Sequence, residues 1–140
     1  MSAYESIVPV RLARLHSQRG HSPGVRVGSL LLISGMLGRD EDLAVVAEPE
    51  AQLTRLFENM GLVLAEAGCD WGDVAELTAY FTDLRRDFEL FMAVRGRFIQ
   101  APYPAMTMVG VAELAQPGLI CEVKGLAVLP DAAVTGRSEA

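Results

Sequence analysis

The sequence has few cysteines and no long apolar run, and both absences narrow its class. Among its 140 residues are two cysteines, Cys69 and Cys121, too few for a disulfide framework, so we expect reduced thiols. No apolar run approaches the roughly 18 residues that a membrane span needs. Arg11, Arg14 and Arg19 have no continuous apolar stretch beside them, as a secretion signal would. We therefore expect a cytoplasmic protein with no membrane partner.

Basic residues are also scarce. Lys and Arg total 12 against 18 Asp and Glu, which gives a net charge of −6. Nucleic-acid binding depends on clustered Lys and Arg that neutralise phosphates, so no nucleic-acid partner is expected. His16 and His21 lack nearby carboxylate or thiol partners in the sequence, so no metal site is expected. No phosphate loop, zinc spacing or Ser-His-Asp order is present, and we expect no cofactor.

The length and the apolar content fit one folded domain. Hydrophobic residues make up 51% of the chain, and at this size about 68% of the unfolded surface can be buried. We expect the domain over residues 20–129. Residues 1–19 are expected to be a lead-in, and residues 130–140 a flexible C-terminal tail of small and polar residues.

Two segments have apolar residues at the helical spacing of three or four. The first predicts an amphipathic helix from Glu50 to Ala67, with Pro49 in its first turn and Gly68 at its C-terminal cap. The second predicts a helix from Asp87 to Ile99. It is expected to end before the proline-containing segment 101–104, because proline disfavours helical conformation in the residue before it.

Strands are predicted at residues 25–27, 30–34, 74–81, 107–111 and 119–128. Gly28 and Ser29 give a hairpin signal between the first two strands, and Gly35 and Gly38 are expected to end that run. The order strand, strand, helix, strand, helix, strand, strand describes a single α+β domain. We predict a mixed β-sheet with both helices on one face.

The last predicted strand separates into two rows, because side chains alternate along a strand. One row is mixed: Ile120, Glu122, Lys124 and Leu126. The other is apolar: Leu119, Cys121, Val123 and Ala127. If the apolar row faces the helices, Cys121 is an inert buried thiol and Glu122 lies on the uncovered face of the sheet. A half-apolar uncovered face indicates burial against other subunits, so we predict a homo-oligomer.

Several short motifs follow one another over residues 20–128. They are V-x-V-G-x-L-x-x-x-S-G at Val25 to Gly35, Q-x-x-x-x-x-E-N at Gln52, Glu58 and Asn59, Ala67-Gly68, Phe81-Thr82-Asp83, Phe88, Pro104-Ala105, and E-V-K-G-L-A at Glu122 to Ala127. Their order and spacing resemble the reactive intermediate deaminase (RidA) family, also called YjgF. The resemblance implies a chorismate-mutase-like α+β fold, a homotrimer and three ligand clefts at the subunit interfaces.

The chain departs from the family pattern at several positions of the implied cleft. In the characterised deaminases an arginine after the Pro-Ala step grips the carboxylate of an imino or enamino acid, and here that position is Met106. His21 stands where a tyrosine is usual, Met36 where a glutamine follows Ser-Gly, and Met92 where an asparagine lies on the second helix. The glutamate of the last strand is retained as Glu122. The resemblance implies that it positions the water that attacks the imine carbon.

We therefore predict that Glu122 is catalytic and that eight residues line a substrate cleft: His21, Ser34, Met36, Phe88, Met92, Arg95, Met106 and Met108. Each has an ordinary alternative. Glu122 can pair with Lys124 or with an arginine of another subunit, the methionines can be core residues, and His21 can be a loop residue. Arg95 is a candidate replacement for the missing arginine, and its alternative is a solvated helix residue.

The resemblance and Glu122 favour a small-molecule imine or enamine deaminase, a hydrolase with altered substrate specificity. The alternative is a non-catalytic trimer that binds a small apolar or aromatic metabolite, because methionines replace polar residues of the cleft. Ribonuclease activity, which some relatives carry by name, is least favoured, because the chain is acidic and lacks a basic aromatic surface. The expected partners are a small-molecule ligand and further copies of this chain.

Overall fold

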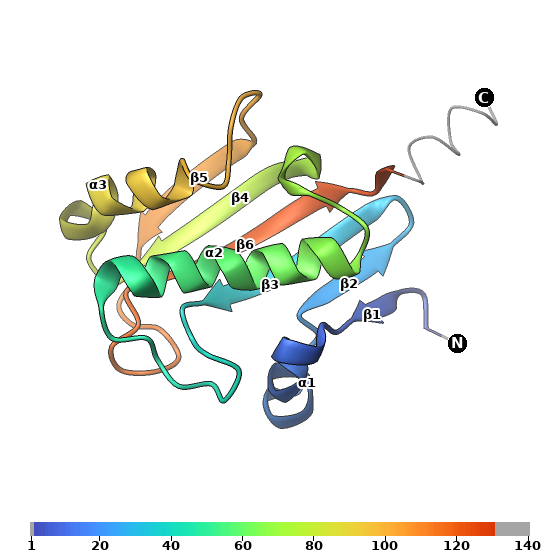
Figure 1. Ribbon diagram of the computed structural model, residues 1–140, viewed down its shortest axis with the longest axis horizontal. Helices are drawn as coiled ribbons and strands as arrows, with labels where there is room; N and C mark the ends of the chain where they lie inside the picture. Colours follow the sequence, from blue (N-terminus) through green and yellow to red (C-terminus); the bar gives the residue numbers. More distant parts are fainter. Residues whose placement is uncertain (1, 131–140) are drawn as a thin grey trace.

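A six-stranded sheet in the order β1-β2-β3-β6-β4-β5 organises residues 2–130, which the computed structural model describes (Figure 1). The strands are β1 (Glu5–Ile7), β2 (Gly24–Val27), β3 (Leu30–Leu37), β4 (Val74–Phe81), β5 (Ala105–Gly110) and β6 (Cys121–Val128). The helices are α1 (Ala13–Arg19), α2 (Pro49–Glu66) and α3 (Leu84–Arg95), with 3-10 turns η1 (Val10–Leu12) and η2 (Trp71–Asp73). Only β4 and β5 pair in parallel, so the sheet is mixed.

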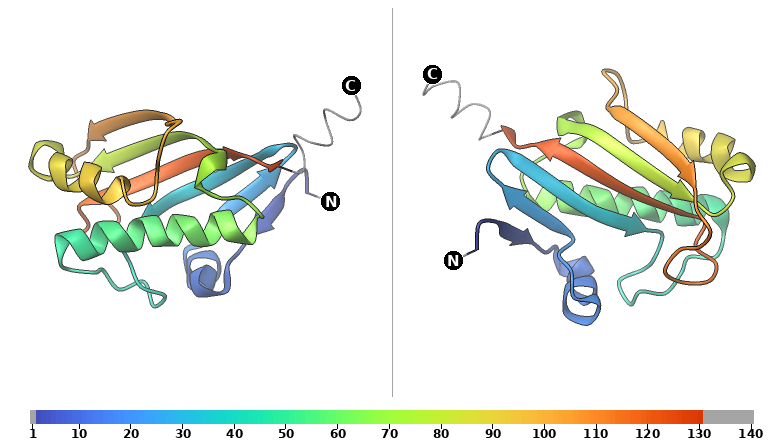
Figure 2. Two further views of the ribbon diagram at one scale, coloured as in Figure 1. Left: turned by 45° about the horizontal axis from the view of Figure 1, so that its top comes forward. Right: turned by 180° about the vertical axis from the view of Figure 1, so that it is seen from behind.

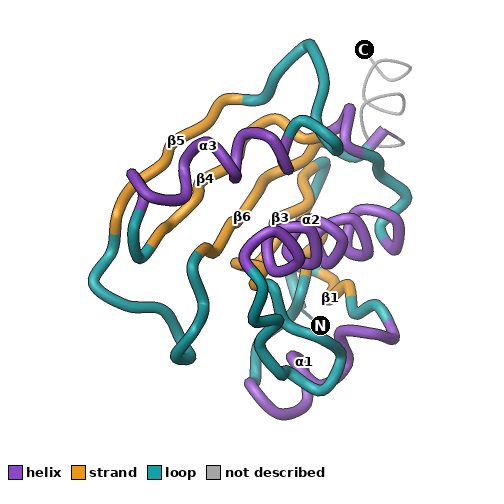
Figure 3. The backbone as a smooth tube through the Cα atoms, turned by 60° about the vertical axis from the view of Figure 1, so that its left-hand side comes forward, coloured by secondary structure: helices purple, strands orange, loops and turns teal. Residues whose placement is uncertain are grey.

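Helices α2 and α3 cover one face of the sheet, while α1 lies near the β1 edge (Figures 1 and 3). Seen from behind, the strands of the other face have no helix over them (Figure 2). We call this surface the open face. The predicted α+β architecture, with a mixed sheet and two helices on one face, is therefore confirmed. None of the helices within residues 2–130 combines the length and apolar character needed to cross a bilayer.

Helix α2 follows its predicted range closely, since the signals at both of its ends are local. The Glu48 carboxylate accepts hydrogen bonds from the backbone N–H groups of Glu50 and Ala51 in the first turn. Pro49 occupies the first helical position. Gly68 follows the helix with φ of 78°, a left-handed conformation that glycine adopts without strain. Helix α3 begins three residues earlier than predicted, because Asp83 caps it by accepting from the backbone N–H of Arg86.

Two local predictions differ from the structure. Residues 1–19 carried no predicted element, but β1, η1 and α1 form there and bury Ile7, Leu12 and Leu15 in the core. Elements this short show too few turns or alternations for a periodic pattern to appear. The expected end of the second strand at Gly35 was wrong, because β3 continues to Leu37 through a register shift. Glycine inside a strand marks such a bulge. The predicted tail lies outside the described residues, apart from Pro130.

Gln52 of α2 holds two separate loops through three of their backbone groups. Its side chain is almost fully buried. Its Nε2 donates to the carbonyls of Val46 and Gly118, both at 2.9 Å, and its Oε1 accepts from the backbone N–H of Ile120 at 2.7 Å. Every hydrogen-bonding group of the amide except one lone pair is thus used. The loop after β3 and the loop before β6 are both fixed to α2.

We predict that Gln52→Leu lowers the free energy of unfolding by about 3–5 kcal/mol, because it removes three hydrogen bonds of a buried amide and leaves three partly buried backbone groups without these partners. Urea unfolding followed by circular dichroism measures the change. Gln18→Leu is the matched control, since Gln18 is exposed on α1. A loss below about 1 kcal/mol, within the range of a surface substitution, would contradict this role for Gln52.

Candidate functional site

Glu122 lies on the open face, as its row in the last strand predicted. Its neighbours Cys121 and Val123 are fully buried against the helices, whereas Glu122 is half-buried on the opposite side. Leu37 on β3 and Tyr80 on β4 are its register partners in the adjacent strands. Glu122 is therefore held in the middle of the sheet rather than on a loop.

The carboxylate of Glu122 rests against the backbone of Gly35, within the bulge of β3. A Cβ atom at Gly35 would collide with the Glu122 carboxylate, so only glycine leaves room for this position. Burial raises the pKa of Glu122, and the positive charges of Arg39 and His21 partly oppose this shift. A half-buried carboxyl group with a raised pKa and nearby cations is suited to exchange a proton with a bound molecule.

Arg39 was not among the predicted site residues, yet its charge acts on Glu122. Its side chain is buried, and Nη1 donates to Oε1 of Gln116 at 2.8 Å. Burial lowers the pKa of Arg39, as does the neighbouring charge of Arg19, whereas Glu122 raises it. Guanidinium groups keep their charge even so. Nothing in the spacing of the sequence marks Arg39, because the residue that holds it lies 77 positions later.

His21 and Ser34 lie together beside a hollow of about 550 Å³ on the open face. The hollow is lined by residues just before β1, in the segment between α1 and β2, and on the strands β2 and β3: Tyr4, Gly20, His21, Ser22, Val25, Val27, Leu32 and Ser34. The Ser34 hydroxyl donates to the Ser22 carbonyl at 2.6 Å, which fixes the segment that carries His21. Two of the predicted cleft residues thus lie near each other on the Glu122 side of the sheet.

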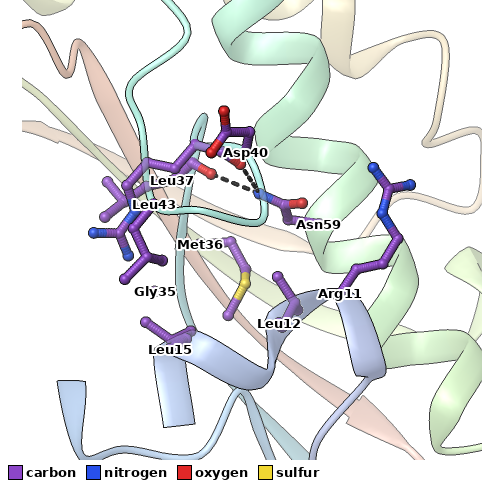
Figure 4. Close-up of a pocket in the computed structure, with 10 residues that line it drawn as sticks. Arg11, Leu12, Leu15, Gly35, Met36, Leu37, Asp40, Leu43 and Asn59 are labelled. Atoms are coloured by element: carbon purple, nitrogen blue, oxygen red, sulfur yellow. Dashed lines mark hydrogen bonds between the residues drawn. The ribbon is translucent and has the colours of Figure 1, made fainter. Parts of the chain in front are cut away.

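Met36 lies on the other side, because it pairs with Val123 in the row that faces the helices. Only 2% of its surface is exposed. Together with Leu12 and Leu15 it lines a cavity of about 10 Å³ (Figure 4), room for about one water molecule. Met36 contacts the core in the single chain, and its ligand contact stays a prediction.

Met106 and Met108 also point toward the helix layer. They pair in register with Leu77 and Ala79, both fully buried, and they pack against the core with half-buried side chains. Met92 of α3 packs against the same core. These three methionines are therefore near the β5 edge of the helix side, and Glu122 is on the opposite face. One chain does not bring the two groups together.

Arg95 joins the group at the β5 edge. Its guanidinium lies over the Tyr103 ring at 5.6 Å and approaches the Met92 sulfur, and its Nε is buried without a hydrogen-bond partner. Phe88, also on α3, is half-buried. Apart from Met36, the predicted site residues thus form two sets. The open-face set consists of Glu122, His21 and Ser34, and the edge set consists of Phe88, Met92, Arg95, Met106 and Met108.

The open-face set offers a carboxylate, an imidazole and a neighbouring guanidinium, which are groups for proton transfer and anion binding. Within residues 2–130 no three His, Cys, Asp or Glu side chains gather as a metal ion would require. Cys121 does not contribute a nucleophile, because burial raises its pKa, with smaller effects from Asp87 and Glu122. The polar groups of the open-face set are suited to acid–base chemistry.

Comparison with known sequences gives a consistent set of relatives. A family model described as Endoribonuclease L-PSP matches residues 12–129. The chain is 34% identical over 127 residues to the RutC family protein YjgH of Escherichia coli, covering 90% of this chain and 95% of that protein. It is 30% identical over 113 residues to the 2-iminobutanoate/2-iminopropanoate deaminase of Dermatophagoides farinae, covering 78% and 85%.

Solved structures share the fold over the same region. The structure of protein YJGH superposes with a TM-score of 0.86 at 32% identity, covering 92% of this chain and 98% of that chain. The structure of E. coli TdcF with bound serine gives a TM-score of 0.71 at 29% identity, covering 77% and 87%.

We predict that Glu122 titrates above the usual range for a glutamate and that Gly35→Ala brings its pKa down. The new methyl group pushes the carboxylate away from the backbone toward solvent, which relieves the desolvation. Carbon-13 NMR of the side-chain carboxyl group across a pH series reports both values. Gly61→Ala on α2 is the control, because a Cβ there meets only Trp71 at ordinary contact distance. The same midpoint in wild type and Gly35→Ala would show that the glycine does not set the carboxylate position.

Proposed function

Because the chain belongs to the Endoribonuclease L-PSP family, which includes the RidA, YjgF and RutC proteins, we propose that it is a small-molecule imine deaminase. Relatives at 30% and 32% identity are named 2-iminobutanoate/2-iminopropanoate deaminases. The observation that carries the proposal is the position of Glu122. Its carboxylate is central in the sheet, partly desolvated and accessible from the open face.

The proposed reaction is hydrolysis of a C=N bond. The ionised Glu122 accepts a proton from a water molecule as the water oxygen bonds to the imine carbon. The protonated carboxyl group returns this proton to the nitrogen, which gives a tetrahedral carbinolamine. Glu122 then transfers the proton of the new hydroxyl group to the amino nitrogen, so that the C=O bond forms as the C–N bond breaks, and a ketone and ammonia leave. One water is consumed and no oxidant or cofactor takes part. A raised pKa suits Glu122 to both steps, since it must give the proton back.

We propose that the cleft is completed by a second copy of the chain. The open-face set and the edge set lie on opposite sides of one sheet, so they form a single cleft only if the edge of one subunit meets the open face of another. In such a cleft Met106 and Met108 would line the wall across from Glu122. The homotrimer implied by the family resemblance provides this arrangement three times.

Two surface features support self-association. The open face carries partly exposed apolar residues, among them Leu32 and Val109, at 42% and 39% exposure. Strand β5 ends the sheet and has the sequence AMTMVG, with no charge and no proline. An uncharged edge strand of this kind is normally covered, because its free backbone groups otherwise pair with other chains.

The substrate in this proposal is small. The relatives named as deaminases act on imino acids of three and four carbons, and the TdcF structure holds serine. Met106 stands where the resemblance places a carboxylate-binding arginine, so the acid group of an imino acid would need another partner here. A changed substrate range follows from this difference.

A non-catalytic metabolite binder is the second candidate. The methionines of the edge set favour it, because a thioether neither donates a proton nor carries charge. Saturable binding without turnover would distinguish this candidate from the deaminase.

The description of the matching family model names an endoribonuclease, but we do not propose that activity for this chain. Its net charge is −6 and its aromatic content is 6%, whereas RNA binding relies on basic surfaces with stacking aromatics. Intact RNA after incubation with highly purified protein is the expected result.

We predict that Glu122→Gln lowers ammonia release from 2-iminobutanoate, generated in situ, at least about 100-fold, because the amide cannot accept the proton. The same change should raise the melting temperature at neutral pH. The folded-state pKa of Glu122 lies above its unfolded value, so ionisation reduces stability as pH rises through the folded pKa, and glutamine is free of this cost.

Wild-type activity should fall as pH drops through the raised pKa of Glu122, because only the carboxylate accepts the proton. Glu113→Gln serves as the control, since Glu113 is exposed in the loop before β6. Full activity in Glu122→Gln would end the proposal.

We predict a particle of three chains, about three times the 15.1 kDa of one chain, in size-exclusion chromatography with light scattering. Leu32→Glu places a charge on the open face and should dissociate the particle. Val10→Glu, at a position 88% exposed near the N-terminus, should leave the mass unchanged. A monomeric wild type that releases ammonia at full rate would rule out the shared cleft.

A further inference from the structure

Positive charge gathers around Glu122 in a chain that is acidic as a whole. The charges of Arg39 and His21 both act on the Glu122 carboxylate, and the charge of Arg19 acts on Arg39. The chain has a net charge of −6. Arg39 and His21 are near the Glu122 carboxylate, and Arg19 is near Arg39. Basic side chains therefore outnumber this one carboxylate locally, and an anion bound there would balance the charge.

Arg39 is held in place more firmly than a surface arginine. Its side chain is 7% exposed, and Gln116 accepts a hydrogen bond from its Nη1. Gln116 in turn donates to the Leu43 carbonyl at 3.1 Å. The backbone of Arg39 is fixed as well, because Nδ2 of Asn59 donates to its carbonyl at 3.0 Å. A guanidinium positioned in this way loses little conformational entropy when it binds a ligand.

The guanidinium is fixed but not saturated. Within residues 2–130 it makes one side-chain hydrogen bond, to Gln116, and forms no ion pair with Glu122. A guanidinium has five N–H groups. None of the Arg39 nitrogens is both buried and without a partner in this part of the chain, so its unused N–H groups reach accessible space. Arg39 lines the same small cavity as Gly35, against which the Glu122 carboxylate rests. The Arg39 side chain is therefore close to Glu122.

We propose that Arg39 binds the carboxylate of the substrate, in place of the arginine that the family carries at the Met106 position. A guanidinium matches a planar carboxylate with two parallel hydrogen bonds. The imine carbon of the same small molecule then faces Glu122. His21 beside Glu122 and Arg19 beside Arg39 are the other basic groups near the two carboxylates. The ligand class is a short 2-imino acid or 2-oxo acid. This assignment rests on the proposed function, because it concerns the same site.

The rival cation is Arg95, which lies on the helix side with its guanidinium over Tyr103. It reaches Glu122 only through a second subunit. Arg39 is already within electrostatic range of Glu122 in one chain. Substitution of Arg39 and substitution of Arg95 are therefore expected to have different effects on the binding of the same ligand.

The test compares two ligands of equal size and different charge. Calorimetric titration measures binding of 2-oxobutanoate, the expected product, and of the uncharged 2-oxobutanamide. Arg39→Met should weaken binding of 2-oxobutanoate by about 10- to 100-fold and leave 2-oxobutanamide within about twofold. Arg39→Lys should recover part of the loss. Arg55→Met is the control, since Arg55 lies on α2 and pairs with Glu58.

Gln116→Met is a second variant, which keeps Arg39 and removes its support. It should weaken the binding of 2-oxobutanoate but not that of 2-oxobutanamide. It replaces Arg39→Met in the test if circular dichroism shows that Arg39→Met does not fold. Equal weakening of both ligands would overturn the proposal and indicate a structural role. Unchanged binding in Arg39→Met with loss in Arg95→Met would move the anchor to the edge set.

The outcomes for the anchor and for the deaminase are separable. Suppose that Arg39→Met loses binding of 2-oxobutanoate but not of 2-oxobutanamide, and that wild type releases no ammonia from 2-iminobutanoate. This result would overturn the deaminase proposal and support the Arg39 anion site. Ammonia release from an uncharged imine, without binding of 2-oxobutanoate to wild type, would retain the deaminase and overturn the Arg39 site.

Discussion

The buried amide of Gln52 is the constraint on which the site depends. It joins the loop that follows β3 to the loop that precedes β6, and it does so through backbone atoms alone. The first loop carries Arg39 and the second carries Gln116, the residue that holds Arg39. A single side chain of α2 therefore fixes the distance between two segments that are far apart in the sequence. About two turns further along the same helix, Asn59 donates hydrogen bonds to the carbonyls of Leu37 and Arg39.

The position of Glu122 in the sheet determines how strongly its carboxylate is desolvated. A carboxylate on an exposed sheet face would be fully solvated and would titrate as an ordinary glutamate. The bulge at Gly35 lowers the carboxylate into the sheet, and this desolvation alone raises its pKa. A second subunit over the open face would exclude more water and strengthen every charge interaction around Glu122. In the proposed assembly, association and chemistry therefore depend on the same surface.

The sequence predicted what depends on regular spacing. The apolar stripe of α2 gave its range, and alternation in the last strand placed Glu122 opposite Cys121 and Val123. What it missed depends on irregular or distant contacts. From the sequence, the bulge at Gly35 was interpreted as the end of a strand, because glycine is common both at bulges and at strand ends. Arg39 gained its position from a hydrogen bond to a residue 77 positions away, and no local pattern encodes such a pair.

The position of β6 in the sheet has a consequence for how the chain reaches its fold. This strand is the last one in the described chain, yet it lies in the middle of the sheet, between β3 and β4. Until it is added, β3 and β4 each expose a row of unpaired backbone groups, and the two halves of the sheet have no direct link. During synthesis the sheet therefore closes only after β6 has been made. Until then the exposed strand edges can pair with other chains. The strand that closes the sheet also carries Glu122, so the Glu122 carboxylate reaches its place beside Gly35 only when the sheet is complete.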